Sequence, residues 1–234
     1  MIERETRALR SDELMSEDLT APFGAHAPNS MQRFLIALAR ATFLHRGKLR
    51  HKMSNLIYAL GKPVDISRMD CNFRVGEHAN LIEYGLMLHP GYNKPEIDFL
   101  SEPLGPGKVA LDIGSNIGLY TLPLTRTGAR VISIDANKAM TDQLQFNLRA
   151  SDLPADDVLH AAVGDTDGMA SLQIHKDDVA IVNIIEDGGG SIPIRRLDRI
   201  LEERGITRVD VLKIDVEGHE DKALVPFLDT AIAR

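Results

Sequence analysis

The chain has 234 residues, of which 44% are hydrophobic, and a formal net charge of -7. This length and composition predict one main domain with a sizeable core and some appended structure. The negative charge argues against general affinity for nucleic acid, because neutralising phosphates requires clustered Lys and Arg.

Two further features of the sequence indicate the compartment in which the protein is expected. Cys71 is the only cysteine, which excludes an intramolecular disulfide and a cysteine-based metal site. The first residues lack the basic-then-apolar order of a signal peptide, and no apolar run approaches the length of a membrane span. The sequence is therefore expected to be cytoplasmic.

The N-terminal part falls into two segments. Residues 1–30 are charged, then rich in Ala, Pro, Gly and Asn, and predict a flexible tail. Residues 31–90 predict a helical extension with short strands. No acidic residue occurs from Gln32 to Val64, and one helical face collects Met31, Phe34, Leu35 and Leu38. Such a basic amphipathic helix suits an anionic membrane or an acidic acceptor, but core packing of the apolar stripe is the interpretation we favour.

From residue 91 to residue 234, apolar runs alternate with helical patterns, which predicts βαβ units. We expect an α/β domain with a Rossmann-like, mostly parallel sheet and helices on both faces. In chain order, the expected elements are a helix at 96–101, strands at 109–113 and 131–134, a helix at 141–150, a strand at 158–163, a hairpin at 169–185, a strand at 209–214 and a helix at 221–228.

The most informative segment is the turn after the first of these strands. The apolar run from Val109 meets Asp112 and then Gly114 and Gly118, so a buried strand turns sharply into a helix. The dinucleotide fingerprint Gly-x-Gly-x-x-Gly is absent. A carboxylate at the strand end repels a pyrophosphate and favours a cationic ligand, which fits S-adenosylmethionine better than NAD.

A second acid supports a nucleoside-type ligand. Asp135 ends the next strand about 20 residues downstream, where doubly wound folds place a carboxylate on ribose hydroxyls. The alternative is purely structural: the glycines permit a tight turn, and Asp112 caps the following helix.

Several motifs together resemble the FkbM family of S-adenosylmethionine-dependent methyltransferases. They cover roughly residues 70–228 and are Phe73-Arg-Val, Glu83, Pro95 to Leu100, Leu111 to Thr121, Ala161 to Asp165 with Gly168, Arg196-Leu-Asp198 and, most specifically, Leu212 to Glu220. The resemblance implies a class I Rossmann-like fold, S-adenosylmethionine as cofactor and methyl transfer to hydroxyl oxygens of sugars, glycolipids or natural products.

The resemblance also implies site residues. Asp112, Gly114, Asn116 and Gly118 would line the methionine part of the cofactor, and Asp135 would hold the ribose. The backbone around Ala162 and the side chain of Asp165 would lie near adenine. Asp215 and Glu217 would stand beside the transferred methyl group, and Glu96, in the matching segment Pro95 to Leu100, is also assigned to the cofactor site.

An alcohol acceptor must lose its proton as the new bond forms, which calls for a general base. Asp215 is the first candidate, since it follows a strand at the edge where open α/β sheets bind ligands; a helix cap or a cofactor contact is the equal alternative. Glu217 and His219 are further candidates. Lys213, inside an apolar strand, is expected to pair with a carboxylate such as Asp112, Glu96 or Glu217.

No metal is expected, because the metal-dependent enzymes of this kind use further acids from a later strand. The resemblance implies three more strands than the sequence up to Arg234 supplies, so the strand at 209–214 is expected to be an open edge that a second copy of the chain could cover. The acceptor is expected to be a small molecule or glycan. The competing functions are an inactive cofactor-binding remnant and, third, a nicotinamide oxidoreductase.

Overall fold

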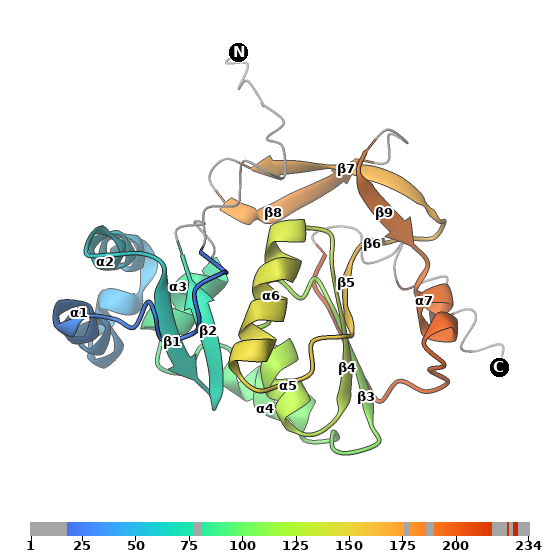
Figure 1. The fold of residues 1–234 in the computed structure, drawn as a ribbon, viewed down its shortest axis with the longest axis horizontal. Helices are drawn as coiled ribbons and strands as arrows, with labels where there is room; N and C mark the ends of the chain where they lie inside the picture. The colour runs from blue at the N-terminus through green and yellow to red at the C-terminus, as the bar shows by residue number, and fades with distance from the viewer. Residues whose placement is uncertain are drawn as a thin grey trace, which may run out of the picture.

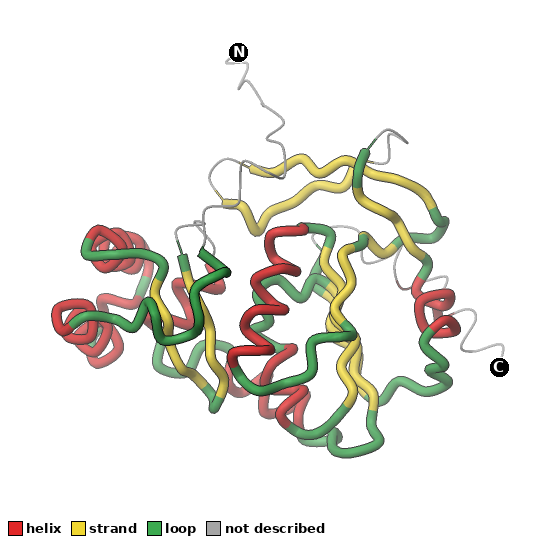
Figure 2. The backbone as a smooth tube through the Cα atoms, viewed as in Figure 1, coloured by secondary structure: helices red, strands yellow, loops and turns green. Residues whose placement is uncertain are grey.

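The computed structural model describes residues 18–76, 81–175, 178–185 and 190–216, together with Leu224, Phe227 and Leu228. An N-terminal helical hairpin lies at one end of the molecule and α7 at the other, with the main sheet between them (Figure 1). A second sheet crosses one end of the main sheet, as the yellow strands of Figure 2 show. Within the described ranges, no helix is both long and apolar enough to cross a bilayer.

The N-terminal extension consists of α1 (Ser30–Ala41), η2 (Phe43–His45), α2 (Gly47–Ala59), β1 (Val64–Arg68), β2 (Cys71–Val75) and α3 (Leu81–Leu88). A capping box between Asn29 and Gln32 starts α1. Contrary to the favoured interpretation, the predicted stripe of α1 does not face the core: Leu35 is buried, but Met31, Phe34 and Leu38 are exposed. The true inner face, Leu35 with Ile36 and Ala39, is rotated from the predicted one.

Residues 18–30 correct the expectation of a flexible tail for that stretch. The guanidinium of Arg74 on β2 donates hydrogen bonds to the carbonyls of Asp18, Ala21 and Pro22. Asp65 on β1 accepts the backbone N–H groups of Gly24 and His26. The segment is therefore fixed to the β1–β2 hairpin. The sequence pattern could not show this, because the partners lie about 50 residues further along the chain.

The main sheet has four parallel strands in the order β10-β3-β4-β5. The strands are β3 (Val109–Ile113), β4 (Arg130–Asp135), β5 (Val158–His160) and β10 (Val211–Ile214). All four therefore place their carboxyl ends at one edge of the sheet. The mixed α/β fold with a parallel sheet, predicted from the alternating pattern, is confirmed.

Helices cover both faces of this sheet, as predicted. On one face lie α4 (Lys94–Ser101), α5 (Thr121–Arg126) and α6 (Lys138–Ala150), and on the other lies α7 (Leu197–Glu203) (Figure 1). Alternation along β3 explains the two layers: Ala110 faces the first core with Leu122 and Leu144, whereas Leu111 and Ile113 face the second with Leu197 and Ile200.

The second sheet has the order β6-β9-β7-β8 and contains β6 (Ala162–Val163), β7 (Gly168–His175), β8 (Asp178–Ile185) and β9 (Ile192–Arg195). The hairpin predicted at 169–185 is confirmed as antiparallel β7 and β8. The single strand predicted at 158–163 is wrong: the chain leaves the main sheet after His160, and β6 pairs with β9 instead. Neither β9 nor α7 was predicted.

Within the described residues, β10 is an edge strand of the main sheet. Apolar hollows flank it on both faces, one lined by Leu201, Ile206, Leu212 and Phe227 and the other by Phe99, Leu100 and Pro103. The strand starts at Val211, two residues later than predicted, and the Asp210 N–H just before it bonds to the carbonyl of Val109. Most of the helix predicted at 221–228 lies outside the described residues. The idea that a second copy covers the open edge stays a prediction.

Candidate functional site

The glycine-containing turn lies at the carboxyl edge of the main sheet. After β3 the chain runs through Gly114 and Asn116, both with positive φ (76° and 49°), and through Gly118 at 96° before α5 begins. The N–H groups of Gly114 and Ser115 both donate to the carbonyl of Ile134, at 2.8 and 3.1 Å. The turn is therefore fixed to the end of β4.

Both glycines are required for close packing as well as for backbone conformation. A Cβ at Gly114 would lie 1.9 Å from the backbone oxygen of Asp215. A Cβ at Gly118 would lie 2.4 Å from the Cδ1 atoms of Leu122 and Leu144. The turn thus packs against the end of β10 on one side and against the first core on the other.

Asp112 is fully buried at the start of this turn. Its Oδ2 accepts a 2.6 Å hydrogen bond from the Thr121 hydroxyl, which in turn lies 2.9 Å from Ser133 Oγ. Its Oδ1 lies 3.2 Å from Lys213 Nζ but makes no hydrogen bond within the described part of the chain. The alternative that Asp112 caps a helix is wrong, since its partner at the start of α5 is a side chain rather than a backbone N–H.

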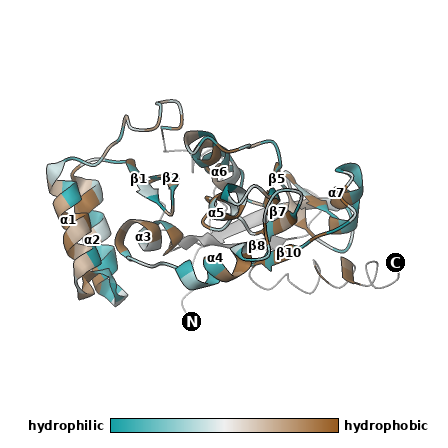
Figure 3. Ribbon diagram, turned by 90° about the horizontal axis from the view of Figure 1, so that it is seen from below, coloured by the Kyte–Doolittle hydropathy of each residue, from teal (hydrophilic) through white to brown (hydrophobic). Residues whose placement is uncertain are grey.

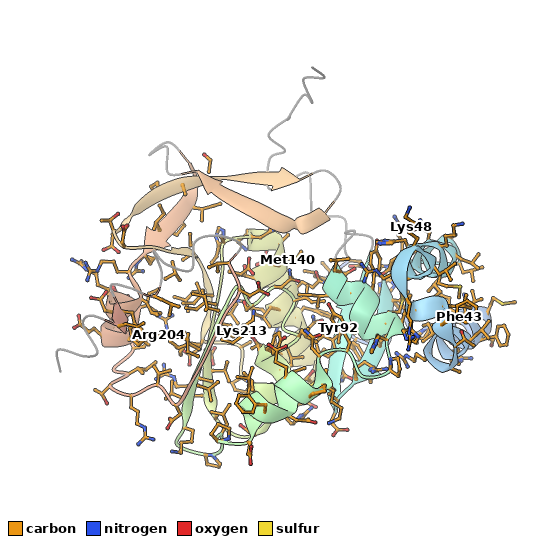
Figure 4. All side chains as sticks on the ribbon, turned by 180° about the vertical axis from the view of Figure 1, so that it is seen from behind. Phe43, Lys48, Tyr92, Met140, Arg204 and Lys213 are labelled. Atoms are coloured by element: carbon orange, nitrogen blue, oxygen red, sulfur yellow. The ribbon has the colours of Figure 1, made fainter. Side chains whose placement is uncertain are left out.

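Lys213 joins the strand ends to the turn. It lies opposite Asp112 in the β10–β3 register. Its Nζ donates a 2.9 Å hydrogen bond to the Gly114 carbonyl, lies 4.0 Å from Asp215 Oδ2 and sits 5.1 Å from the centre of the Tyr120 ring. Figure 4 shows Lys213 in the interior of the domain. The predicted pairing of this lysine with Asp112 is confirmed.

Asp135 closes the other side of the turn. Its two carboxylate oxygens accept the N–H groups of Asn116 and Asn137, each at 2.8 Å. Burial raises the pKa of Asp135, and the nearby Asp112 adds to this, although the two backbone hydrogen bonds and Lys213 act in the opposite direction. The carboxylate still has lone pairs that could accept ligand hydroxyls.

Tyr120 brings Glu96 to the site. The Tyr120 hydroxyl donates to Glu96 Oε2 and accepts from Asn93 Nδ2, both at 2.8 Å. Burial, reinforced by the bond to Glu96, raises the pKa of Tyr120 above its usual range. Glu96 itself is on the exposed side of α4. Sequence reasoning missed Tyr120 and Asn93, because nothing in their spacing shows that α4 approaches the turn.

The remaining predicted residues lie at different distances from the turn. Asp215 follows β10 and is 67% exposed, while its N–H donates to the Ile113 carbonyl. Ala162 is buried in β6, next to Ala161, whose N–H bonds to the Asp135 carbonyl. Asp165 is exposed and bonds to the neighbouring Thr166, and no hydrogen bond among the described residues joins it to the cluster. Glu217 and His219 lie outside the described residues.

The cluster as a whole is acidic and incompletely hydrogen-bonded. Among the described residues, Asp112, Asp135 and Asp215 supply three carboxyl groups close to the ammonium of Lys213. Two buried polar atoms, Asp112 Oδ1 and Ser115 Oγ, have no hydrogen-bond partner within the described residues. Because such atoms are costly when left unpaired, this corner fits a polar ligand with positive charge, as S-adenosylmethionine is. Sequence reasoning missed Ser115.

Two curated proteins are similar to parts of this chain. A 173-residue stretch is 25% identical to the AMB antimetabolite synthetase AmbE of Pseudomonas aeruginosa, covering 56% of this chain and 8% of that protein. A 67-residue stretch is 42% identical to the protein-L-isoaspartate O-methyltransferase of Chromobacterium violaceum, covering 29% of this chain and 28% of that protein. The chain thus spans a small part of either curated relative.

A solved structure, the SAM-dependent methyltransferase from Agrobacterium tumefaciens, is similar to this chain with a TM-score of 0.33 and 17% sequence identity. The match covers 42% of this chain and 31% of that one, a likeness too distant to support an inference. The family model for the methyltransferase FkbM domain, by contrast, matches residues 112–234, which is more than half of the chain and begins at the buried acid of the turn. The chain therefore belongs to the methyltransferase FkbM domain family.

Proposed function

We propose that this chain is an S-adenosylmethionine-dependent methyltransferase that transfers the methyl group to a hydroxyl of a sugar, glycolipid or small natural product. The observation that carries the proposal is the acidic, incompletely hydrogen-bonded corner at the turn, where Asp112 Oδ1 and Ser115 Oγ are buried without hydrogen-bond partners among the described residues. Family membership supports the same reaction class. The Chromobacterium violaceum relative is named an O-methyltransferase, which supports oxygen as the acceptor atom.

Residues of three strand ends would hold the cofactor. Asp112 and the turn from Gly114 to Gly118 would face the charged methionine part, with Ser115 as an added hydroxyl donor. Asp135 would accept hydrogen bonds from the ribose hydroxyls, since each of its oxygens has so far one backbone donor. The backbone near Ala162 would lie toward adenine, and a contribution from Asp165 there remains a prediction.

S-adenosylmethionine supplies a methyl group that its sulfonium already activates. The chain must then align the acceptor and receive the proton that the hydroxyl loses. Asp215 is our candidate for the general base that receives this proton. It is the exposed carboxylate directly beside the turn, and its backbone lies against Gly114. Glu217 and His219 remain candidates for the same role or for binding the acceptor.

Titration calorimetry tests the cofactor. Wild-type protein should bind S-adenosylmethionine and S-adenosylhomocysteine and should not bind NAD. Asp135→Asn should weaken binding roughly ten-fold or more, because it replaces a charged acceptor by a neutral one. Asp98→Asn, an exposed carboxylate on α4 paired with Lys94, is the matched control and should bind like the wild type. Preferential NAD binding, unaffected by Asp135→Asn, would contradict the proposal.

Methyl transfer from isotope-labelled cofactor to glycan and lipid extracts tests catalysis. Asp215→Asn should lower the transfer rate about 100-fold, within the range for loss of a general base, while leaving cofactor affinity unchanged. Cofactor binding without transfer to any acceptor would instead support the inactive remnant.

A further inference from the structure

The α1–α2 hairpin, residues 30–60 with the turn η2 between the helices, differs in charge from the rest of the chain. The segment from Gln32 to Val64 has no Asp or Glu. Its basic residues are Arg33, Arg40, Arg46, Lys48, Arg50, Lys52 and Lys62. Since these seven charges belong to a chain of net charge -7, the remaining residues carry -14. The molecule is therefore strongly polarised, with its positive end at the hairpin.

The same hairpin exposes most of the large apolar side chains that the described part of the protein leaves in solvent. Seven of eleven lie here: Met31 (55% exposed), Phe34 (59%), Leu38 (36%), Phe43 (67%), Leu49 (37%), Leu56 (48%) and Leu60 (41%). Figure 3 shows the two helices side by side at one end of the molecule, with hydrophobic (brown) segments along both. Single exposed apolar residues are ordinary, but a concentration of this kind marks an interaction surface.

The exposed stripe is not a core face that happens to be loosely packed. The inner sides of the two helices are occupied by Leu35, Ile36, Ala39 and Ile57, all buried. Gln32 closes the join between the helices by donating to the carbonyls of Ile57 and Gly61. The helices thus have a complete set of contacts on their inner side and a second apolar stripe facing outward.

The basic side chains on this outer surface are available for a partner. Lys48 and Lys52 are exposed and make no ion pair within the described residues. Arg33 and Arg46 are also exposed, and their hydrogen bonds go to Pro28 O with Ser30 Oγ and to His45 Nε2 rather than to a carboxylate. Figure 4 shows Phe43 and Lys48 together on the hairpin, at the end of the molecule opposite Arg204.

We propose that the outer surface of the α1–α2 hairpin binds the surface of an anionic lipid bilayer, with its exposed apolar side chains in the headgroup region and its Lys and Arg on the lipid phosphates. Apolar and basic side chains side by side on surface helices are the pattern of interfacial membrane binding. Nucleic acid would use the charges and leave Phe34 and Phe43 in water. The acidic remainder of the molecule is repelled by the same bilayer, which favours contact through the hairpin.

Co-sedimentation of the full chain with vesicles tests the proposal independently of catalysis. The protein should bind vesicles of phosphatidylcholine mixed with phosphatidylglycerol and should not bind pure phosphatidylcholine. Binding should weaken as salt is raised. Phe34→Ser with Phe43→Ser, and separately Lys48→Glu with Lys52→Glu, should each lower the partition coefficient about ten-fold or more, since each basic residue contributes roughly five-fold near an anionic surface.

Matched controls change the same chemistry elsewhere. Phe99→Ser removes a 72% exposed phenyl ring from α4, and Arg199→Glu with Arg208→Glu reverses two exposed charges far from the hairpin. Both controls should bind like the wild type, and circular dichroism should show all variants folded. Equal binding to neutral vesicles, binding unaffected by the hairpin variants, or no binding at low salt would overturn the proposal. So would a wild-type dimer that the phenylalanine variants dissociate without any vesicle binding.

Discussion

Two buried acid–base pairs in this molecule look alike in type and differ in how completely they are hydrogen-bonded. In the first, on β1 and β2, Arg74 contacts Asp65 at 2.7 and 3.0 Å and uses its remaining donors on backbone carbonyls, while its guanidinium lies 4.2 Å from the centre of the Phe146 ring. In the second, at the turn, Lys213 contacts Asp112 at 3.2 Å without a hydrogen bond to Oδ1.

The difference separates a structural pair from a binding site. A buried pair whose donors and acceptors are all matched holds its neighbours in place, here residues 18–26. A buried pair with an unmatched carboxylate oxygen beside an unmatched hydroxyl is costly in isolation and gains from a ligand. We therefore expect substitutions at the first pair to act on stability and those at the second to act mainly on cofactor affinity.

The largest expected effect is at Arg74. Arg74→Met should lower the free energy of unfolding by about 3–5 kcal/mol, because Asp65 is left as an uncompensated buried charge. Urea denaturation measures this, with Arg199→Met on the exposed side of α7 as a control that should change stability by no more than about 0.5 kcal/mol. A loss below about 1 kcal/mol for Arg74→Met would show that the pair is not the structural one.

Gly114→Ala comes next. The added Cβ would lie 1.9 Å from the Asp215 oxygen at φ 76°, so we expect a loss of about 1–3 kcal/mol and at least roughly ten-fold weaker S-adenosylmethionine binding. Gly107→Ala is a matched control, because its φ is 81° but nothing lies within 4 Å of the added Cβ. If both variants lose affinity equally, backbone strain rather than contact with Asp215 is responsible.

Two buried serines give a finer comparison of smaller size. Ser151 Oγ accepts from the Asn72 N–H and donates to the Asn147 carbonyl, both at 2.8 Å, whereas Ser115 Oγ has no such partner among the described residues. Ser151→Ala should cost about 1 kcal/mol of stability without changing cofactor affinity. Ser115→Ala should leave stability unchanged or slightly raised and weaken S-adenosylmethionine binding. If Ser151→Ala weakened cofactor binding and Ser115→Ala did not, the placement of the cofactor at the turn would be contradicted.

The pH dependence of the two regions, the β1–β2 pair and the turn with Asp135, should differ in kind. Burial alone raises the pKa of Asp65, but hydrogen bonds from Arg74, Gly24 and His26 outweigh it and hold the pKa below the ordinary 3.8. Its contribution to stability is therefore complete above the ordinary pKa and is lost as pH falls through the lowered one. In urea denaturation, the free energy of unfolding of the wild type should therefore approach that of Asp65→Asn as pH falls.

At the turn the sign is opposite. Burial raises the pKa of Asp135 above 3.8, so the folded protein protonates this group earlier than an ordinary aspartate as pH falls. The carboxylate that we propose for the ribose is then lost at a pH above the ordinary value. Measured by calorimetry, the affinity of the wild type for S-adenosylmethionine should decline at a pH above 3.8, whereas that of Asp135→Asn should not change with pH in this range. A decline of the wild-type affinity only below pH 3.8 would contradict the assignment of Asp135 to the ribose.

Much of the main sheet could be predicted because its signals are local. The apolar runs at Val109 and Val131 and the acids that follow them, Asp112 and Asp135, specify strands that end in a site at one edge. Lys213 was assigned a carboxylate partner because a lone ammonium in an apolar strand is costly, and that reasoning needs no coordinates. The prediction of a single strand at 158–163 was wrong, because apolar alternation does not show which sheet a strand joins.

The sequence by itself therefore determined the parallel α/β class, the position of the turn and the acids beside it, since periodicity and glycine placement act over a few residues. Only the tertiary structure decided which buried groups are satisfied. Arg74 is matched by carbonyls about 50 residues away and Tyr120 by Glu96 and Asn93. Ser115 Oγ and Asp112 Oδ1 are left without hydrogen-bond partners among the described residues. The exposed face of α1 was likewise decided by the tertiary structure. It depends on the side at which α2 and the core pack, and helical spacing in the sequence does not show this.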